Sequence, residues 1–198
     1  MSIKETVIQE LIDREMIRDV LHRYAVGVDR CDEVILRSTY WPDARDHHSD
    51  FVGSGDEFVR KFIPQLRAQF VKTQHFLGSS LIRIEGGTAA SVETYTHNWH
   101  TVKSAAGYQH DILQGARYLD KFEKRGEEWR INDRVVCTDW IMENPRTVDF
   151  SGGVLGQSGH VTGARYPEDP QYRHLGGFPP GGVLGSRKEA RTDIKRQG

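Results

Sequence analysis

The chain has 198 residues, of which 37% are hydrophobic and 28% charged, a composition typical of a globular protein with one domain and room for an appendage. A formal net charge of −1 at pH 7 gives no strong field toward nucleic acid or anionic lipid, so we expect neither partner. No apolar run approaches membrane-spanning length and the N-terminal MSIKETVIQE lacks the order of a secretory signal, so we expect a cytoplasmic protein without a membrane partner.

The first predicted element is a long amphipathic helix. Residues 5–28 repeat apolar side chains at three- and four-residue steps, with Asp, Arg and Glu between them. A short helix is expected over Glu33–Ser38, where Asp32 is placed to cap the N-terminus. Pro42, in the run WPDA, is expected to interrupt the chain after this second helix.

A third helix is predicted to begin after Ser54. Ser54 and Glu57 have the spacing of a capping box, in which the two residues exchange side-chain to backbone hydrogen bonds at the helix start. The helix is expected to continue to about Gln69, with a kink near Pro64.

From His75 onward the periodicity is that of extended strands. The predicted strands are Phe76–Glu85, Ala89–Val102, Tyr108–Lys124 and Trp129–Met142. Turns at Gly86-Gly87 and Arg125-Gly126-Glu127 would join them as hairpins, and bulges are expected in strands of this length. Helices followed by consecutive strands predict an α+β fold, in which a curved antiparallel sheet wraps over the helices and encloses a pocket.

The composition changes after Pro145. Residues 151–186 hold ten of the twenty glycines and four of the seven prolines, and they lack the apolar periodicity of a second domain. We therefore divide the chain into a domain over residues 1–145 and a Gly/Pro-rich arm over residues 146–198. The arm is expected to be extended or partly disordered, or to lie on the body or on a neighbouring subunit.

Tyr24, Asp29 and His75 are the residue types that can move a proton without a metal. A carboxylate can fix the tautomer of an imidazole, the imidazole can accept a proton near neutral pH, and a phenol can bind a carbonyl oxygen. Spacing alone favours a plainer alternative, in which a solvated aspartate ends the helix and a histidine bonded to backbone begins the strand. Sequence separation does not decide whether these groups meet.

Three runs carry a resemblance to a known family: DREMIRDVLHRYAVGVDRCD with YWPDA, TQHFLGSSLIRIEG with VETY, and GARYLDKFEKRGEEWRINDRVV with DW. In this order, over roughly residues 8–142, the chain resembles the SnoaL-like branch of the nuclear-transport-factor-like superfamily. The resemblance implies a cone-shaped α+β barrel, with N-terminal helices packed on a strongly curved, mainly antiparallel sheet around an apolar pocket. Enzymes of this family include scytalone dehydratase, bile acid dehydratase and hexachlorocyclohexane dehydrochlorinase. The run PEDPQYR resembles family members with a long C-terminus.

The resemblance also implies roles for the three proton-handling residues. His75 matches the strand histidine that acts as general base, and Asp29 matches the helix aspartate that orients it and makes it more basic. Tyr24 matches a tyrosine that faces the substrate, where it would donate to an oxygen and stabilise an enolate.

Other residues are candidates for substrate binding, each with a plainer alternative. Arg134 resembles a pocket arginine and could hold a leaving group or a substrate carboxylate; an outward salt bridge on the sheet is equally compatible. Asn98 and His100 share one face of their strand, and His100 matches by spacing a second pocket histidine that could act as an acid. Tyr40 and Trp41 lie where the family places pocket or core aromatics, and core packing is the favoured alternative for both.

The sequence offers no metal or nucleotide site. The pairs His97/His100 and His47/His48 each point to opposite faces of a strand, and Cys31 and Cys137 stand alone, so neither zinc nor a disulfide is indicated. GxGxxG and GKS/T loops are absent, and the glycines at 152, 153, 156 and 159 lack the strand–helix setting of a phosphate loop. We therefore predict no cofactor.

These observations predict a cofactor-free dehydratase-like lyase, or an isomerase, acting on a small apolar cyclic substrate. The alternative is a non-catalytic binding or assembly module, such as the barrel of a dioxygenase small subunit, because fold does not fix function. The resemblance also implies a homo-oligomer, a dimer or a trimer associated through the exposed face of the sheet.

Overall fold

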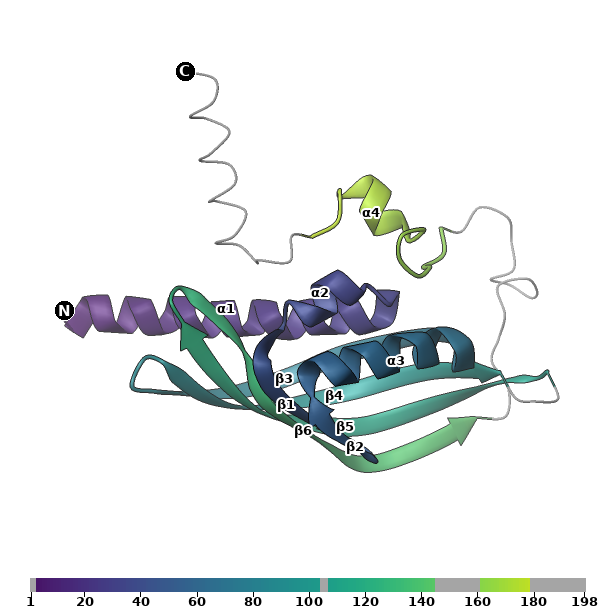
Figure 1. The fold of residues 1–198 in the computed structure, drawn as a ribbon, viewed down its shortest axis with the longest axis horizontal. Coiled ribbons are helices and arrows are strands. Elements are labelled where there is room, and N and C mark those ends of the chain that lie inside the picture. Colours follow the sequence, from purple (N-terminus) through teal and green to yellow (C-terminus); the bar gives the residue numbers. More distant parts are fainter. Residues whose placement is uncertain (1–2, 104–106, 145–160, 179–198) are drawn as a thin grey trace, which may run out of the picture.

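The computed structural model describes residues 3–103, 107–144 and 161–178. Its elements are α1 (Ile3–Arg30), α2 (Glu33–Arg37), β1 (Tyr40–His48), β2 (Phe51–Ser54), α3 (Gly55–Gln69), β3 (Phe70–Glu85), β4 (Ala89–Lys103), β5 (Gln109–Arg125), β6 (Glu128–Asn144) and α4 (Pro170–His174). The strands form one six-stranded sheet in the order β2-β1-β6-β5-β4-β3 (Figure 1). Only the β1–β6 pair is parallel among these described strands.

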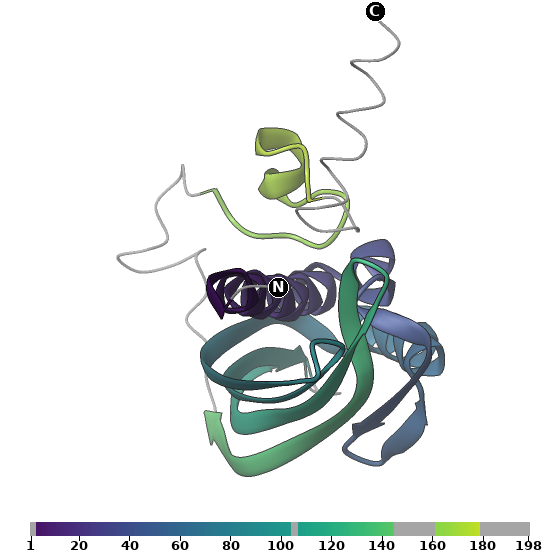
Figure 2. The same ribbon diagram turned by 90° about the vertical axis from the view of Figure 1, so that its left-hand side faces the viewer.

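The sheet is strongly curved, and α1 lies across its concave side with α3 beside it (Figure 2). The edge strands β2 and β3 do not pair, so the sheet remains open. Side chains from the helices and from the inner face of the sheet form one buried core. The predicted fold class is therefore confirmed: this is an α+β protein with N-terminal helices packed on a curved, mainly antiparallel sheet.

The predicted first and second helices are confirmed. α1 buries an apolar stripe that ends at Val28, and Asp32 caps α2 by accepting a hydrogen bond from the Ile35 N–H at 3.1 Å. Gly27 allows the two helices to pack closely, because a Cβ added there would lie 2.8 Å from the backbone of Leu36. This contact fixes the end of α1, where Asp29 lies.

The region from Tyr40 to Ser54 differs from the expectation. It forms the strands β1 and β2, although Pro42 was expected to interrupt the chain. Pro42 lies where the register between β1 and β6 shifts, and a proline is tolerated at such an irregularity because no ladder N–H is required there. The partner β6 lies far along the chain, so no local pattern indicates the pairing.

The later elements agree closely with the expectation. Ser54 and Glu57 form the predicted capping box of α3, and Gly86 and Gly87 turn the β3–β4 hairpin with positive φ. β3 begins at Phe70, earlier than predicted, and its pairing with β4 is shifted between Leu77 and Ser80. Irregularities also occur between β5 and β6, as expected for such long strands.

Residues 161–178 lie against the end of α1, on the side away from the sheet (Figure 1). The Tyr166 N–H donates to the Arg30 carbonyl at 2.6 Å, Asp169 pairs with Arg30 at 3.1 Å, and the Tyr172 hydroxyl donates to Asp32 at 2.8 Å. This part of the predicted arm is therefore ordered on the body. The rest of the arm, with the glycines at 152, 153, 156 and 159, lies outside the described residues. In the described part of the chain, no helix is long and apolar enough to span a membrane.

Candidate functional site

Asp29 and His75 meet across the interface between α1 and β3. One carboxylate oxygen of Asp29 lies 2.6 Å from His75 Nδ1, and the other accepts the backbone N–H of His75 at 2.9 Å. Their side chains are only 10% and 5% exposed. The carboxylate therefore holds both the ring and the backbone of His75. With the proton on Nδ1, facing the carboxylate, Nε2 carries the free lone pair.

Asp29 is held in its charged form. Burial raises the pKa of Asp29, but the charge of His75 and hydrogen bonds from its ring and backbone outweigh burial, so the net pKa is lowered. An ionised carboxylate on Nδ1 stabilises the imidazolium that forms when Nε2 accepts a proton. The pair has the chemistry of an oriented general base.

His100 and Asn98 lie beside His75 on β4. Asn98 is the direct partner of His75 in the β3–β4 register, and the His75 and His100 ring centres are 5.4 Å apart at 85°. Burial, followed by the charge of His75, lowers the pKa of His100 to about 4. At neutral pH His100 is an uncharged hydrogen-bonding group, which disfavours the acid role that spacing suggested.

Tyr24 and Arg134 lie together in the core. The Arg134 guanidinium stands 4.0 Å from the Tyr24 ring centre and 4.2 Å from that of Tyr118. It also forms two hydrogen bonds with Asp120, of 2.7 and 2.6 Å, and both side chains are fully buried. Arg134 therefore faces inward, and the outward salt bridge considered as its alternative does not occur. Burial raises the pKa of Tyr24, so its hydroxyl remains a donor at neutral pH.

The side chains of Tyr40 and Trp41 point to opposite faces of β1, as those of consecutive strand residues do. The Tyr40 hydroxyl is buried and donates to Asp46 at 2.6 Å. Trp41 donates instead to the Glu123 carbonyl at 2.9 Å and stacks with Arg125 and Arg130, at the turn end of the β5–β6 hairpin. The structure brings Tyr40 to the other candidates and leaves Trp41 away from them.

Two inward residues, Asp46 and His48, were not singled out from the sequence. Asp46 is fully buried, and His48 packs on Phe58 and Phe62 with ring centres 5.1 and 4.9 Å apart. The signal that could have found them is alternation in ARDHH, where Ala44, Asp46 and His48 point inward. That signal applies only once β1 is known to be a strand.

Several buried polar atoms in this interior have no hydrogen-bond partner among the described residues. They are Tyr24 Oη, Asp46 Oδ1, His48 Nδ1, Asn98 Oδ1, His100 Nδ1, Tyr118 Oη and Arg134 Nη1. Native cores pair nearly all such atoms, because each unpaired one costs about 1–3 kcal/mol. These atoms are the groups in this interior that a bound polar molecule could pair.

The candidate site is distinct from a surface depression of about 340 Å³ between α1 and β3. Its lining residues are Arg18, Leu21, His22, Leu77, Gly78, Ser79 and Ser80. Within the described ranges, no group of three or more His, Cys, Asp or Glu side chains is arranged to bind a metal.

The C-terminal segment touches the backbone that carries the site. Arg165 donates to the carbonyl of Asp29, to the Thr73 hydroxyl at 2.7 Å and to the Phe70 carbonyl at 3.2 Å. Arg67 also contributes to this region: it donates hydrogen bonds to the carbonyls of Cys31 and Tyr166, both at 3.1 Å. A single guanidinium thus links the end of α1 to the start of β3.

Comparison with known proteins assigns the sequence to a family. The model of the SnoaL-like domain matches residues 9–135. An uncharacterized protein of Mycobacterium tuberculosis, Rv2910c, is 25% identical over 130 residues, which cover 65% of this chain and 86% of the relative.

Solved structures share the fold at lower identity. Hexachlorocyclohexane dehydrochlorinase LinA-type3 from Novosphingobium barchaimii LL02 is 17% identical, with a TM-score of 0.61 over 70% of this chain and 94% of that chain. A type 2 LinA dehydrochlorinase is 19% identical, with a TM-score of 0.63 over 69% and 91%. At this identity the likeness concerns the fold. Since the family model covers well over half of the sequence, the chain belongs to the SnoaL-like domain family.

Proposed function

We propose that this protein is a cofactor-free lyase of the dehydratase type, or an isomerase, acting on a small apolar cyclic compound. The observation that carries the proposal is the Asp29–His75 pair, with His75 Nδ1 held at 2.6 Å and Nε2 available as a base. The fold neighbours named as dehydrochlorinases support an elimination, because that name describes removal of hydrogen and chlorine from a ring compound.

The proposed reaction begins when His75 Nε2 takes a proton from the carbon next to a carbonyl group. The Tyr24 hydroxyl donates to the carbonyl oxygen as negative charge develops there. As the carbon–carbon double bond forms, a hydroxyl leaves from the adjacent carbon and takes the proton back from His75, so one water is released. An isomerase would return the same proton to another carbon, with the same residues.

Arg134 is better suited to a neutral substrate group than to a carboxylate. Its charge is already balanced by Asp120, and Asp46 adds a second carboxylate nearby. A substrate carboxylate would therefore meet repulsion in a buried site. This favours neutral, largely apolar ring compounds as substrates.

An ultraviolet assay with a panel of cyclic β-hydroxy ketones tests the proposal. Wild type is expected to produce a conjugated-enone band that His75→Gln does not produce. His47→Gln is the matched control, since His47 is exposed on the outer side of β1. An enone band of equal rate in His75→Gln would rule out the mechanism, and silence of wild type across the panel would favour the binding-module alternative.

We also propose that the protein forms a homo-oligomer through the outer sheet face. This face displays exposed apolar side chains of β3 to β6, namely Phe76, Leu81, Tyr95, Trp99, Leu119, Trp140 and Met142. An apolar surface of this breadth is typical of a protein interface.

A further inference from the structure

Asp46, His48 and Arg134 form a second group of polar side chains, separate from the Asp29–His75 pair. Asp46 on β1 and Arg134 on β6 are direct partners in the parallel register, and His48 follows on the same face of β1. His48 Nδ1 lies 3.8 Å from Asp46 Oδ1, beyond hydrogen-bond range. The Asp46 and Arg134 side chains are fully buried and that of His48 is 17% exposed.

Each of these three residues keeps one polar atom unpartnered among the described residues. Asp46 uses Oδ2 for the Tyr40 hydroxyl and leaves Oδ1, while Arg134 uses Nε and one terminal nitrogen for Asp120 and leaves Nη1. His48 leaves Nδ1. The unpartnered set therefore combines an acceptor, a donor and an imidazole nitrogen that can be either.

Only some ligand groups satisfy this set. A carboxylate or phosphate has no proton for Asp46 Oδ1 and would add negative charge beside Asp46 and Asp120. An ammonium has no lone pair for Arg134 Nη1 and would add positive charge beside that guanidinium. A hydroxyl group can donate to Asp46 and accept from Arg134 at the same time.

His48 is the uncharged member of this group. Burial, then the charges of Arg134, His75 and His100, lowers the pKa of His48 to about 3. The His48 ring is therefore uncharged at neutral pH. Phe58 stacks on the His48 ring and Phe62 packs against it at a tilt, so apolar surface lies beside these polar groups.

We propose that Asp46, His48 and Arg134 form a buried polar subsite that binds a neutral hydroxyl on the substrate, a group other than the carbonyl next to the carbon that His75 deprotonates. The inference rests on the proposed function and narrows its substrate class to ring compounds with two polar groups. One group is the carbonyl, and the other is the hydroxyl.

Calorimetric titration of the full-length protein with three related ketones tests the subsite without turnover. The probes are α-tetralone, its analogue hydroxylated on the distal ring, and its analogue carboxylated at the same position. The hydroxylated ketone is expected to bind wild type about ten-fold more tightly than α-tetralone, because its hydroxyl bonds charged groups. The carboxylated ketone is expected to bind more weakly than the hydroxylated one.

Asp46→Leu removes the acceptor and should reduce this preference to less than about two-fold, whereas His47→Gln should keep it. Asp46→Asn, which preserves shape, should give an intermediate preference if the leucine variant does not fold. Equal affinities for the two neutral ketones, no binding of either, or tightest binding of the carboxylate would overturn the subsite. Binding preference without turnover would leave the subsite standing while the lyase proposal fails, so the two failures are distinguishable.

Discussion

Asp29 holds its histidine by two hydrogen bonds, one to the ring and one to the backbone. An ionised aspartate oxygen can only accept a hydrogen bond, so it favours the ring proton on Nδ1 and the lone pair on Nε2. Asp29 thus sets both the position and the tautomer of His75, the proposed base.

Asp29→Asn is expected to lower kcat by about 100-fold or more, since the amide can donate to Nδ1 and favour the tautomer with Nε2 protonated. Steady-state kinetics on the most reactive ketone of the panel measure the effect. KM should change much less than kcat, and circular dichroism should show an unchanged fold. Activity of the variant equal to wild type would exclude Asp29 as the orienting group.

Asp46 should influence how stability depends on pH. Burial raises its pKa from 3.8 to about 6, against the opposing hydrogen bond from Tyr40 and the charge of Arg134. The folded state therefore binds the Asp46 proton more tightly than the unfolded state, so stability declines as pH rises from about 4 to about 6.

Asp46→Asn removes this titration. Relative to the variant, wild type should lose up to about 3 kcal/mol of unfolding free energy across that pH range and show no further change above it. Urea unfolding at a series of pH values measures both curves. Parallel curves, or a wild-type curve that rises relative to the variant, would contradict the buried position of Asp46.

At the scale of elements, local sequence signals predicted the helices and hairpins, but they did not indicate which distant strands pair. Ser54, Glu57, Gly86 and Gly87 act within their own segments, so their capping and turn roles could be predicted from sequence. β1 is defined by pairing with β6, about 90 residues later, and this contact has no local pattern.

The contrast between local signals and long-range strand pairing also explains which site residues could be predicted from the sequence. The family resemblance indicated Asp29 and His75, and the structure places them in contact. Asp46 and His48 lie on the unrecognised strand, so the alternation that points them inward could not be applied. The inward direction of Arg134 depends on its pairing with Asp120, which only the folded sheet provides.

The segment of residues 161–178 is an element that the match to the SnoaL-like domain does not include, since that match ends at residue 135. Arg165 in this segment holds the carbonyl of Asp29 and the hydroxyl of Thr73, two residues before His75. It is therefore placed to fix the separation of α1 and β3 at the Asp29–His75 pair.

Arg165→Ala is expected to lower kcat about ten-fold with a smaller change in KM, because the pair would lose a constraint on its geometry. Arg165→Lys should restore part of the activity, and nuclear magnetic resonance of the His75 ring should report the altered environment. Arg173→Ala, in the same segment, is the matched control. Unchanged kcat and an unchanged His75 signal in Arg165→Ala would show that the segment does not position the pair.

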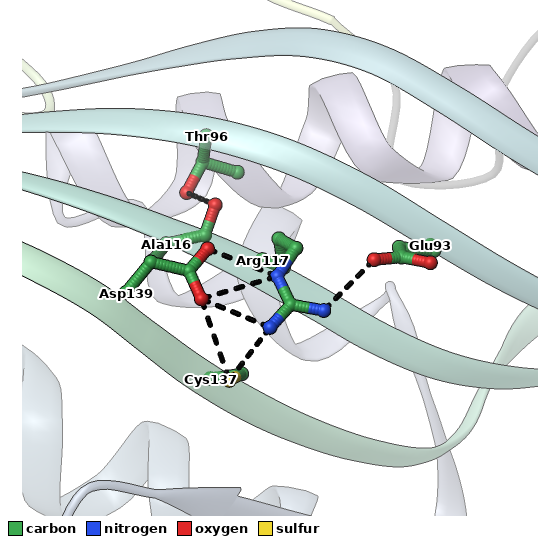
Figure 3. Close-up of polar contacts among 6 residues, drawn as sticks. All are labelled: Glu93, Thr96, Ala116, Arg117, Cys137 and Asp139. Atoms are coloured by element: carbon green, nitrogen blue, oxygen red, sulfur yellow. Dashed lines mark hydrogen bonds and ion pairs between the residues drawn. The ribbon is translucent and has the colours of Figure 1, made fainter.

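For the whole molecule, the outer sheet face combines apolar side chains with a central polar network. Arg117 on β5 donates to Asp139 at 2.9 Å and to Glu93 at 2.9 Å, and it also contacts the Cys137 sulfur at 3.2 Å (Figure 3). These hydrogen bonds fix the Arg117 side chain between Glu93 on β4 and Asp139 on β6. Burying a charged side chain in an interface costs less desolvation free energy when its charge is already paired within its own subunit.

Phe76→Glu should convert the proposed homo-oligomer to a monomer, because it adds a charge to an apolar contact. Phe76 is 68% exposed, so the monomer fold should tolerate the change. Sedimentation velocity measures the mass of each protein. Val34→Glu, on α2 and 64% exposed, is the control and should keep the wild-type mass. A monomeric wild type, or an unchanged mass in Phe76→Glu, would contradict an interface on this face.

His75, oriented by Asp29, is proposed to remove a proton from a carbon next to a carbonyl group. Proton exchange tests it most directly, since exchange requires no leaving group. α-Tetralone would be incubated in deuterium oxide with wild type, His75→Gln or His47→Gln, and loss of the proton signal next to the carbonyl would be followed by nuclear magnetic resonance. We predict exchange above background with wild type and His47→Gln, and background exchange with His75→Gln. Equal exchange in wild type and His75→Gln would contradict the account.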